Sequence, residues 1–254
     1  MEKGGGSDGI KKKSGQAIGI DVGGTKIKAG LVDGEGKVLK LYTIPTLREK
    51  GAANVLKKIE DLIKELSKSA TGNILGVGLA LPGAVDEQRG SCLYCPNLKW
   101  GEVEVSEQLT KGTGLPVRLV NDANAACLGE YLYGGGQGVS TFLSITLGTG
   151  VGSGLILNGR LYTGRFGSGV EAGHMVIDSA GSLCSCGRRG CWETLVSAPA
   201  MIKRTKEKGK DFPQSQLSAI LDNDWQKLAP EKIFQASREG DALAREVVKE
   251  TIYY

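Results

Sequence analysis

The sequence lacks any long apolar run, and this excludes proteins that cross a membrane by a helix. No stretch approaches the roughly 18 apolar residues that such a helix requires. Residues 1–16, MEKGGGSDGIKKKSGQ, also lack the apolar segment of a signal peptide, so we expect a disordered leader there. These absences predict a soluble, cytosolic protein without a membrane partner.

Strong charge is missing too. The formal net charge is only +4, and the basic residues are too scattered to indicate a nucleic-acid partner. Glycine, in contrast, is abundant: the 39 glycines amount to about twice the usual share of roughly 7%. They gather in short runs such as GTGVGSG, which indicates backbone brought close to a ligand.

The apolar pattern predicts alternating strands and helices. A helix is indicated by a single stripe made of Val55, Ile59, Leu62 and Leu66, and a second helix is expected at 125–134. The predicted strands are 17–22, 26–32, 37–44, 73–83 and 115–121. A strand–turn–strand pattern restarts near residue 141, where Gly148-Thr149 aligns with Gly24-Thr25. This weak repeat suggests two related halves, each with a Gly-Thr turn between its first two strands.

Both glycine turns are candidate phosphate sites. The first turn follows Asp21 and consists of Gly23, Gly24, Thr25 and Lys26, and the second consists of Gly148, Thr149 and Gly150. Glycine lets backbone N–H groups approach phosphate oxygens, and the threonine and lysine side chains add donors. A carboxylate at the strand end, here Asp21, can hold Mg²⁺ through water. The alternative is a tight hairpin that needs glycine for its backbone alone.

A carboxylate suited to proton transfer follows the predicted strand 115–121. Asn121 and Asp122 stand where this strand ends and the next helix begins. A carboxylate in such a place can remove a proton from an attacking hydroxyl, which is worth roughly 10²–10⁴-fold in rate. Asp and Asn are equally favoured as helix N-caps, so the residues alone leave both readings of Asp122 open.

Three cysteines and the single histidine have the spacing of a metal site. Cys184, Cys186 and Cys191 form C-x-C-x₄-C, with His174 ten residues upstream. Cys₃His is a common tetrahedral zinc set, and a site closed by four protein ligands is structural. A disulfide would leave an odd cysteine, and a redox pair would more naturally be C-x-x-C. The remaining cysteines, Cys92, Cys95 and Cys127, are expected in the core, although the first two have redox spacing.

Five segments stand in the order and spacing of the ROK family of repressors, open reading frames and sugar kinases. These segments are IGIDVGGTKIKAGLVD, NDANAACLGE, LGTGVGSGLILNG, EAGHMVID and CSCGRRGCWE. The chain resembles this family from Ala17 to Ala200, and its bacterial glucokinases most. The resemblance implies an α/β, actin-like ATPase fold with two ribonuclease-H-like domains around a cleft for ATP and sugar. We place these domains at 17–121 and 122–254.

The resemblance also implies roles for individual residues. It makes Asp122 the catalytic base and lets Asn121 hold a sugar hydroxyl. Glu171, His174 and Glu193 would form a sugar platform braced by the metal, with the second ring nitrogen of the histidine turned toward the cleft. Without the resemblance, both glutamates could equally be surface charges. Weaker matches to sugar contacts are Gly83 and Asn97.

The ends of the chain depart from the family pattern. Family kinases continue with a glycine-rich turn against adenosine and a helix that returns to the first domain, so we expect a second domain that is incomplete after Tyr254. We expect this to weaken nucleotide binding more than sugar binding. Family repressors begin with a winged helix-turn-helix, which residues 1–16 cannot form, so we expect no repressor function.

The resemblance implies an ATP-dependent hexose kinase that acts on the 6-hydroxyl, with glucose the leading substrate. Mg²⁺ would enter with ATP, zinc would be structural, and the chain would form a homo-oligomer, either a dimer or a tetramer. Open alternatives are another sugar (N-acetylglucosamine, N-acetylmannosamine, fructose or allose), polyphosphate as donor, or a sugar sensor without turnover. Asp122 favours the kinase, because a sensor needs no base.

Overall fold

The computed structural model describes residues 15–164, 167, 169–221 and 224–254, so the predicted leader lies almost wholly outside the described residues. The strands are β1 (Gln16–Val22), β2 (Lys26–Asp33), β3 (Val38–Pro45), β4 (Ile74–Leu81), β5 (Ala84–Asp86), β6 (Ser91–Tyr94), β7 (Val103–Glu104), β8 (Val117–Asn121), β9 (Phe142–Leu147), β10 (Val151–Leu157) and β11 (Arg160–Leu161). The α-helices are α1 (Ala52–Lys68), α2 (Val105–Thr113), α3 (Asp122–Tyr133), α4 (Glu193–Val196), α5 (Ala198–Lys208), α6 (Leu217–Ile220), α7 (Pro230–Glu239) and α8 (Ala242–Tyr253). Short 3₁₀ helices are η1 (Arg48–Lys50), η2 (Pro96–Leu98), η3 (Ala172–His174), η4 (Gly209–Asp211) and η5 (Trp225–Lys227). None of the described helices could span a membrane.

The chain divides into two compact units. The first holds Met1–Ser144 and Gly154–Val170, and the second holds Ile145–Ser153 and Glu171–Tyr254. This division differs from the boundary predicted after residue 121, because helix α3 packs against β4 and β8 of the first unit. Strands β9 and β10 each contribute residues to both units.

The first unit is built on a five-stranded sheet with the order β3-β2-β1-β4-β8. The predicted meander is confirmed, since β1 pairs antiparallel with β2 and β2 pairs antiparallel with β3. Strands β1, β4 and β8 run parallel, so their carboxyl ends share one edge of the sheet. At this edge Asp21 pairs with Ala80, and Leu81 pairs with Asn121. The sheet therefore places two of the predicted site residues at one edge.

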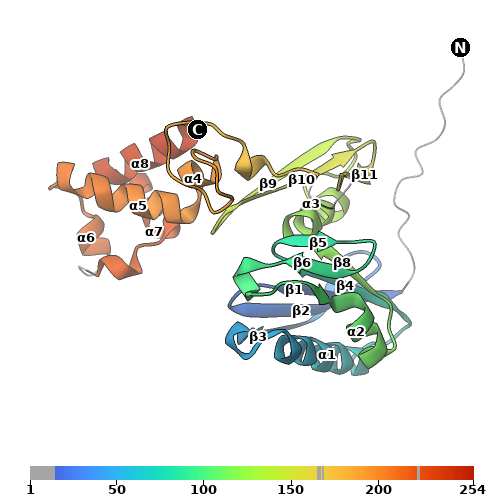
Figure 1. Cartoon of the computed structure of the whole chain (residues 1–254). Coiled ribbons are helices and arrows are strands. Elements are labelled where there is room, and N and C mark those ends of the chain that lie inside the picture. The colour runs from blue at the N-terminus through green and yellow to red at the C-terminus, as the bar shows by residue number, and fades with distance from the viewer. Residues whose placement is uncertain (1–14, 165–166, 168, 222–223) are drawn as a thin grey trace, which may run out of the picture. The chain divides into compact units, whose positions relative to one another are not determined.

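A single apolar core holds the helices of this unit to the sheet. The four residues of the predicted stripe on α1 are all buried, together with Leu56 and Ile63. They pack with the buried faces of β1, β2 and β4 and with α2, and Figure 1 shows α1 and α2 side by side along the sheet. The core prediction for Cys92, Cys95 and Cys127 is confirmed, because each is fully buried. A small sheet, with the order β5-β6-β7, carries Cys92.

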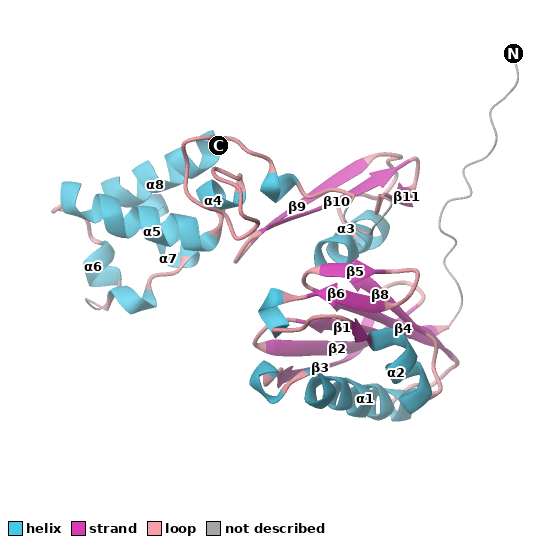
Figure 2. Cartoon of the chain, in the orientation of Figure 1, coloured by secondary structure: helices cyan, strands magenta, loops and turns pink. Residues whose placement is uncertain are grey.

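The second unit is mostly helical in its described part (Figure 2). Its main core joins α5, α6, α7 and α8 through Met201, Leu217, Leu221, Leu228, Ile233, Ala236, Leu243, Ala244 and Val247. A smaller cluster packs Val151, at the start of β10, against Leu195 and Val196 of α4. The predicted repeat is confirmed at the level of the strands, since Gly24-Thr25 separates β1 from β2 and Gly148-Thr149 separates β9 from β10.

Candidate functional site

Asp122 stands at the shared edge of the parallel strands and is the first residue of α3. Burial raises the pKa of its carboxyl, and the negative charge of Asp21 at the end of β1 adds to the rise. A hydrogen bond from the backbone N–H of Ala123 to Oδ1, at 2.9 Å, opposes the shift. The result is a half-buried carboxyl group with a raised pKa, a property that makes Asp122 a candidate general base.

Asn121, and not Asp122, caps helix α3. Its Oδ1 accepts hydrogen bonds from the backbone N–H groups of Ala123, at 2.9 Å, and Asn124, at 3.2 Å. Its Nδ2 donates to the carbonyl oxygen of Gly83 at 3.1 Å. The cap reading that the sequence left open for Asp122 therefore belongs to its neighbour. The contact predicted between Asn121 and a sugar hydroxyl stays a prediction.

The backbone conformation at Gly83 requires glycine. Its φ of +122° lies outside the range that other residues adopt easily, and a Cβ there would lie 2.5 Å from the carbonyl oxygen of Tyr94. A side chain would therefore displace the loop and take the Gly83 carbonyl away from Asn121.

Substitution of Asn121 separates its two roles. We expect Asn121→Ala to lower the free energy of unfolding by about 1 kcal/mol, because the cap is lost. Asn121→Ser keeps an uncharged acceptor for the helix N–H groups but lacks the amide that donates to Gly83, so its stability should stay within a few tenths of a kcal/mol of wild type. Urea unfolding of the three proteins measures this. Equal losses in both variants would mean that the bond to Gly83, and not the cap, carries the stability.

The first glycine turn is closed by its own backbone and by the end of β3. Gly23 N–H donates to the Lys26 carbonyl at 2.9 Å. The fully buried Thr46 donates from Oγ1 to the Gly23 carbonyl at 2.7 Å and from its N–H to the Thr25 carbonyl at 3.0 Å. The side chains of Thr25 and Lys26 are exposed beside this fixed backbone. Thr25 and Lys26 thus offer the side-chain donors predicted for a phosphate site, whereas the N–H of Gly23 is used within the turn.

Asn97 and Arg48 lie against this turn. A Cβ on Gly24 would be 3.0 Å from the Asn97 carbonyl oxygen and 3.2 Å from Nη1 of Arg48. The same Nη1 donates to the Asn97 carbonyl at 2.7 Å. Sequence reasoning missed both Thr46 and Arg48, although one signal was present. The predicted hairpin of β2 and β3 pairs Lys26 with Pro45, which brings the residues after β3 to the turn.

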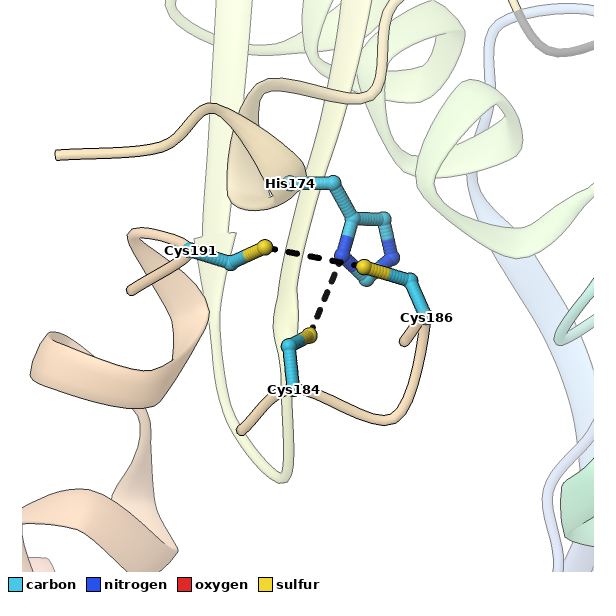
Figure 3. Close-up of side chains that lie close together, drawn as sticks. All are labelled: His174, Cys184, Cys186 and Cys191. Atoms are coloured by element: carbon cyan, nitrogen blue, oxygen red, sulfur yellow. Dashed lines mark hydrogen bonds between the residues drawn. The ribbon is translucent and has the colours of Figure 1, made fainter. Parts of the chain in front are cut away.

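In the second unit, His174, Cys184, Cys186 and Cys191 converge, with their ligand atoms all within 4.8 Å of one another (Figure 3). His174 Nδ1 lies 3.5 Å from the Cys184 sulfur, and the sulfurs of Cys186 and Cys191 lie 3.6 Å apart. A tetrahedral ion with zinc–sulfur and zinc–nitrogen bonds would set such atoms about 3.6–3.8 Å apart. The four side chains therefore fit one metal ion.

Local backbone structure explains why these ligands meet. Gly187 and Gly190 have φ values of +88° and +67°, and a Cβ on Gly190 would lie 1.4 Å from the Asp178 carbonyl oxygen. A bridge between Val176 and Cys191 brings the histidine segment beside the last cysteine. Hydrogen bonds from the backbone and the side chain of Arg188 lower the pKa of the Cys186 thiol to about 6. This favours the thiolate, the form that binds metal, at Cys186 alone, because burial raises the pKa of the neighbouring Cys191 thiol to about 12.

The two glutamates of the cysteine motif have different surroundings. Glu171 is exposed, and its carbonyl accepts the N–H of His174 at 3.0 Å. Glu193 begins α4, and its Oε2 accepts the N–H of Val151 at 3.0 Å. A Cβ on Gly150 would lie 2.4 Å from this same oxygen. Glu193, in the segment that follows the metal loop, thus holds the second glycine turn in place. The sequence did not reveal this contact.

Each unit gathers a part of the predicted site. The first unit holds Asp21, Gly23, Gly24, Thr25, Lys26, Gly83, Asn97, Asn121 and Asp122. The second unit holds Gly148, Thr149, Gly150, Glu171, His174, Cys184, Cys186, Cys191 and Glu193. Within the first unit the structure joins Gly24 to Asn97 and Gly83 to Asn121. Within the second it joins the metal loop to the second glycine turn.

The chain is similar to proteins of known type. A model of the ROK family matches residues 17–254. A glucokinase of Thermotoga maritima is 40% identical over 228 residues, which cover 89% of this chain and 71% of that protein. The xylose repressor of Bacillus subtilis is 35% identical over 207 residues, which cover 78% of this chain and 53% of that protein. The crystal structure of a ROK family glucokinase from Streptomyces griseus with glucose and AMPPNP is 36% identical, with a TM-score of 0.81 and coverage of 93% of this chain and 75% of that one.

Proposed function

The chain belongs to the ROK family and has its actin-like ATPase fold, and on that premise we propose that it is a hexose kinase. It transfers the terminal phosphoryl group of ATP, bound as its magnesium complex, to the 6-hydroxyl of a sugar, with glucose the leading substrate. The observation that carries the proposal is the placement of Asp122, half-buried at the shared strand edge with a raised pKa. Glucose and AMPPNP in the Streptomyces griseus relative support this choice of ligands.

In the proposed reaction, Asp122 accepts the proton of the 6-hydroxyl as the hydroxyl oxygen attacks the γ-phosphorus. The new bond joins that oxygen to phosphorus, the bond from phosphorus to the β–γ bridging oxygen breaks, and ADP leaves with the electron pair. Asp21 would hold the magnesium complex through water. Phosphate oxygens would be received by the exposed side chains of Thr25 and Lys26 and by N–H groups of the glycine turns other than those of Gly23 and Gly148, which already donate to the carbonyls of Lys26 and Gly150. Asn97, Asn121, Glu171, His174 and Glu193, together with the Gly83 backbone, orient the sugar.

The metal in this proposal is zinc, and its role is structural. Three thiolates and an imidazole are the donor set that zinc prefers, and the ligand spacing fits a tetrahedral ion. Four protein ligands leave no open position, so the ion supplies rigidity to the loop. His174 binds through Nδ1 and keeps Nε2 for a sugar hydroxyl.

A second candidate function is sugar sensing without turnover, which the likeness to the Bacillus subtilis xylose repressor favours. The geometry of Asp122 argues against it, because a sensor has no use for a base. Other sugars and polyphosphate remain rivals for the two substrates.

A coupled ADP-release assay of the full-length gene product over a panel of sugars tests the proposal, with calorimetry on the same sugars. The panel contains glucose, fructose, allose, N-acetylglucosamine and N-acetylmannosamine, and polyphosphate replaces ATP in a parallel series. We expect turnover with ATP, highest for glucose. Sugar binding without phosphorylation by either donor would instead identify a sensor.

A further inference from the structure

Arg48 occupies the space that the missing side chain of Gly24 leaves open. Its Nη1 lies 3.2 Å from where a Cβ on Gly24 would stand, and it donates to the Asn97 carbonyl at 2.7 Å. A guanidinium has five N–H groups in a planar fork. Among the described residues, one hydrogen bond from this side chain is seen, and the N–H groups of Nε and Nη2 are left for another acceptor.

The backbone on both sides of this contact is held in an unusual conformation. Three described residues other than glycine have a positive φ, namely Leu47, Lys99 and Asn158. Leu47, with φ 55°, precedes Arg48, and Lys99, with φ 59°, follows the short helix that carries Asn97. Non-glycine residues in this region are disfavoured and cluster at ligand sites. The structure therefore keeps Arg48 and Asn97 in place against a local preference.

The negative charges near the first glycine turn would have to be compensated by a cation if a phosphate is to bind there. Asp21 and Asp122 put two carboxylates at the adjoining strand edge, close enough for the charge of Asp21 to raise the pKa of Asp122. A phosphate drawn into this region would be repelled unless positive groups compensate. Lys26 in the turn is exposed, whereas Arg48 is half-buried and fixed by its bond to Asn97. A planar guanidinium also matches two phosphate oxygens at once.

We propose that Arg48 binds the phosphoryl group that is transferred, first as the terminal phosphate of the donor and then as the phosphate monoester of the sugar product. This inference rests on the proposed function and adds a residue to it. Arg48 then has two tasks: one N–H holds the Asn97 loop at the glycine turn, and the remaining fork receives phosphate oxygens. The chemistry that it recognises is a tetrahedral oxyanion and not the sugar.

Calorimetry with three probes tests the proposal: glucose, glucose 6-phosphate and the non-hydrolysable analogue AMPPNP. The variants are Arg48→Met, Arg48→Lys and, as a matched control, Lys50→Met, which removes a positive charge from an exposed position of the same short helix. We expect Arg48→Met to weaken glucose 6-phosphate and AMPPNP by at least about 10-fold and glucose by less than about 3-fold. Arg48→Lys should fall between, and Lys50→Met should match wild type.

Each other outcome contradicts the proposal in a recognisable way. An equal loss for glucose and glucose 6-phosphate in Arg48→Met would mean that Arg48 only holds the Asn97 loop. No loss for either phosphate ligand would remove Arg48 from the site while the kinase proposal stands. If the wild-type protein binds glucose but neither phosphate ligand, the proposed function itself fails. Arg48→Lys keeps a donor for the Asn97 carbonyl. It therefore tests the same role of Arg48 if the methionine variant fails to fold.

Discussion

Asp122→Asn is expected to lower kcat by about 10²-fold or more while sugar affinity changes far less. Asparagine preserves the shape of the side chain, and its Oδ1 can still accept the N–H of Ala123. It cannot accept the proton of an attacking hydroxyl. Because Asn121 supplies the cap of α3, the substitution leaves the helix start intact, so the loss isolates the chemical step.

The same variant should be more stable than wild type at neutral pH. Burial raises the pKa of Asp122 above its unfolded value, so the ionised carboxylate disfavours the folded state once the pH exceeds the folded pKa. Asparagine carries no charge and removes this cost. Thermal unfolding at pH 7 should show a higher midpoint together with the loss of turnover, which distinguishes a removed base from a damaged fold.

The pH dependence of the wild-type enzyme follows from the same shift. The base must be ionised, so kcat/KM should fall as the pH is lowered through the pKa of Asp122, which lies above the usual value for aspartate of about 3.9. Asp61→Asn, an exposed carboxylate on α1, is the matched control and should keep full activity. Turnover within a few-fold of wild type in Asp122→Asn would place the base elsewhere.

Cys186→Ser is expected to remove the metal and abolish sugar binding. A serine hydroxyl does not replace a thiolate ligand, and structural zinc contributes an apparent ~10–16 kcal/mol in small peptides. Cys186 is the exposed member of the cluster, so the substitution itself removes little packing. Without the ion, His174 and the segments that bear Glu171 and Glu193 lose their common anchor. The glucose platform should therefore disappear as a whole.

Elemental analysis and X-ray absorption check the metal: we expect one zinc per wild-type chain, bound by three sulfurs and one nitrogen, and none in Cys186→Ser. Calorimetry with glucose checks the platform, and Ser185→Ala, an exposed neighbour, serves as control. Hydrogen exchange should also quicken at the Val151 amide, because Glu193 holds it. Unchanged glucose affinity in the metal-free protein would show that the platform forms without zinc.

The sequence predicts best what depends on neighbours along the chain. The stripe on α1, the hairpins of β1 to β3, both Gly-Thr turns and the Cys₃His cluster each follow from a local period or spacing. The contact of Arg48 with Gly24 could not be found in this way, because it depends on the register of β2 and β3.

The cap of α3 and the contact of Glu193 could not be predicted, because in each case the sequence allows two arrangements. Asn121 and Asp122 are both good caps, and only the structure shows that Asn121, the last residue of β8, takes the N-cap position of α3. The sequence alone allows Glu193 to face solvent. In the structure its carboxylate reaches the Val151 N–H because Gly150 has no side chain that would block it. The compact units differ from the predicted domains for a similar reason, since α3 packs back on the first sheet.

The metal ligands all lie between residues 174 and 191, and this nearness in sequence affects folding. The entropy cost of closing a loop grows with its length, by about 0.6 kcal/mol for each doubling, so this short span costs less than a set of ligands spread along the chain would. An unfolded or nascent chain can therefore gather much of the same ligand set before α5 to α8 exist. Because binding to the unfolded chain cancels part of the stabilisation, zinc should raise the free energy of unfolding by less than its affinity suggests. We therefore expect the ion to bind early in folding, before the helices of the second unit have packed together.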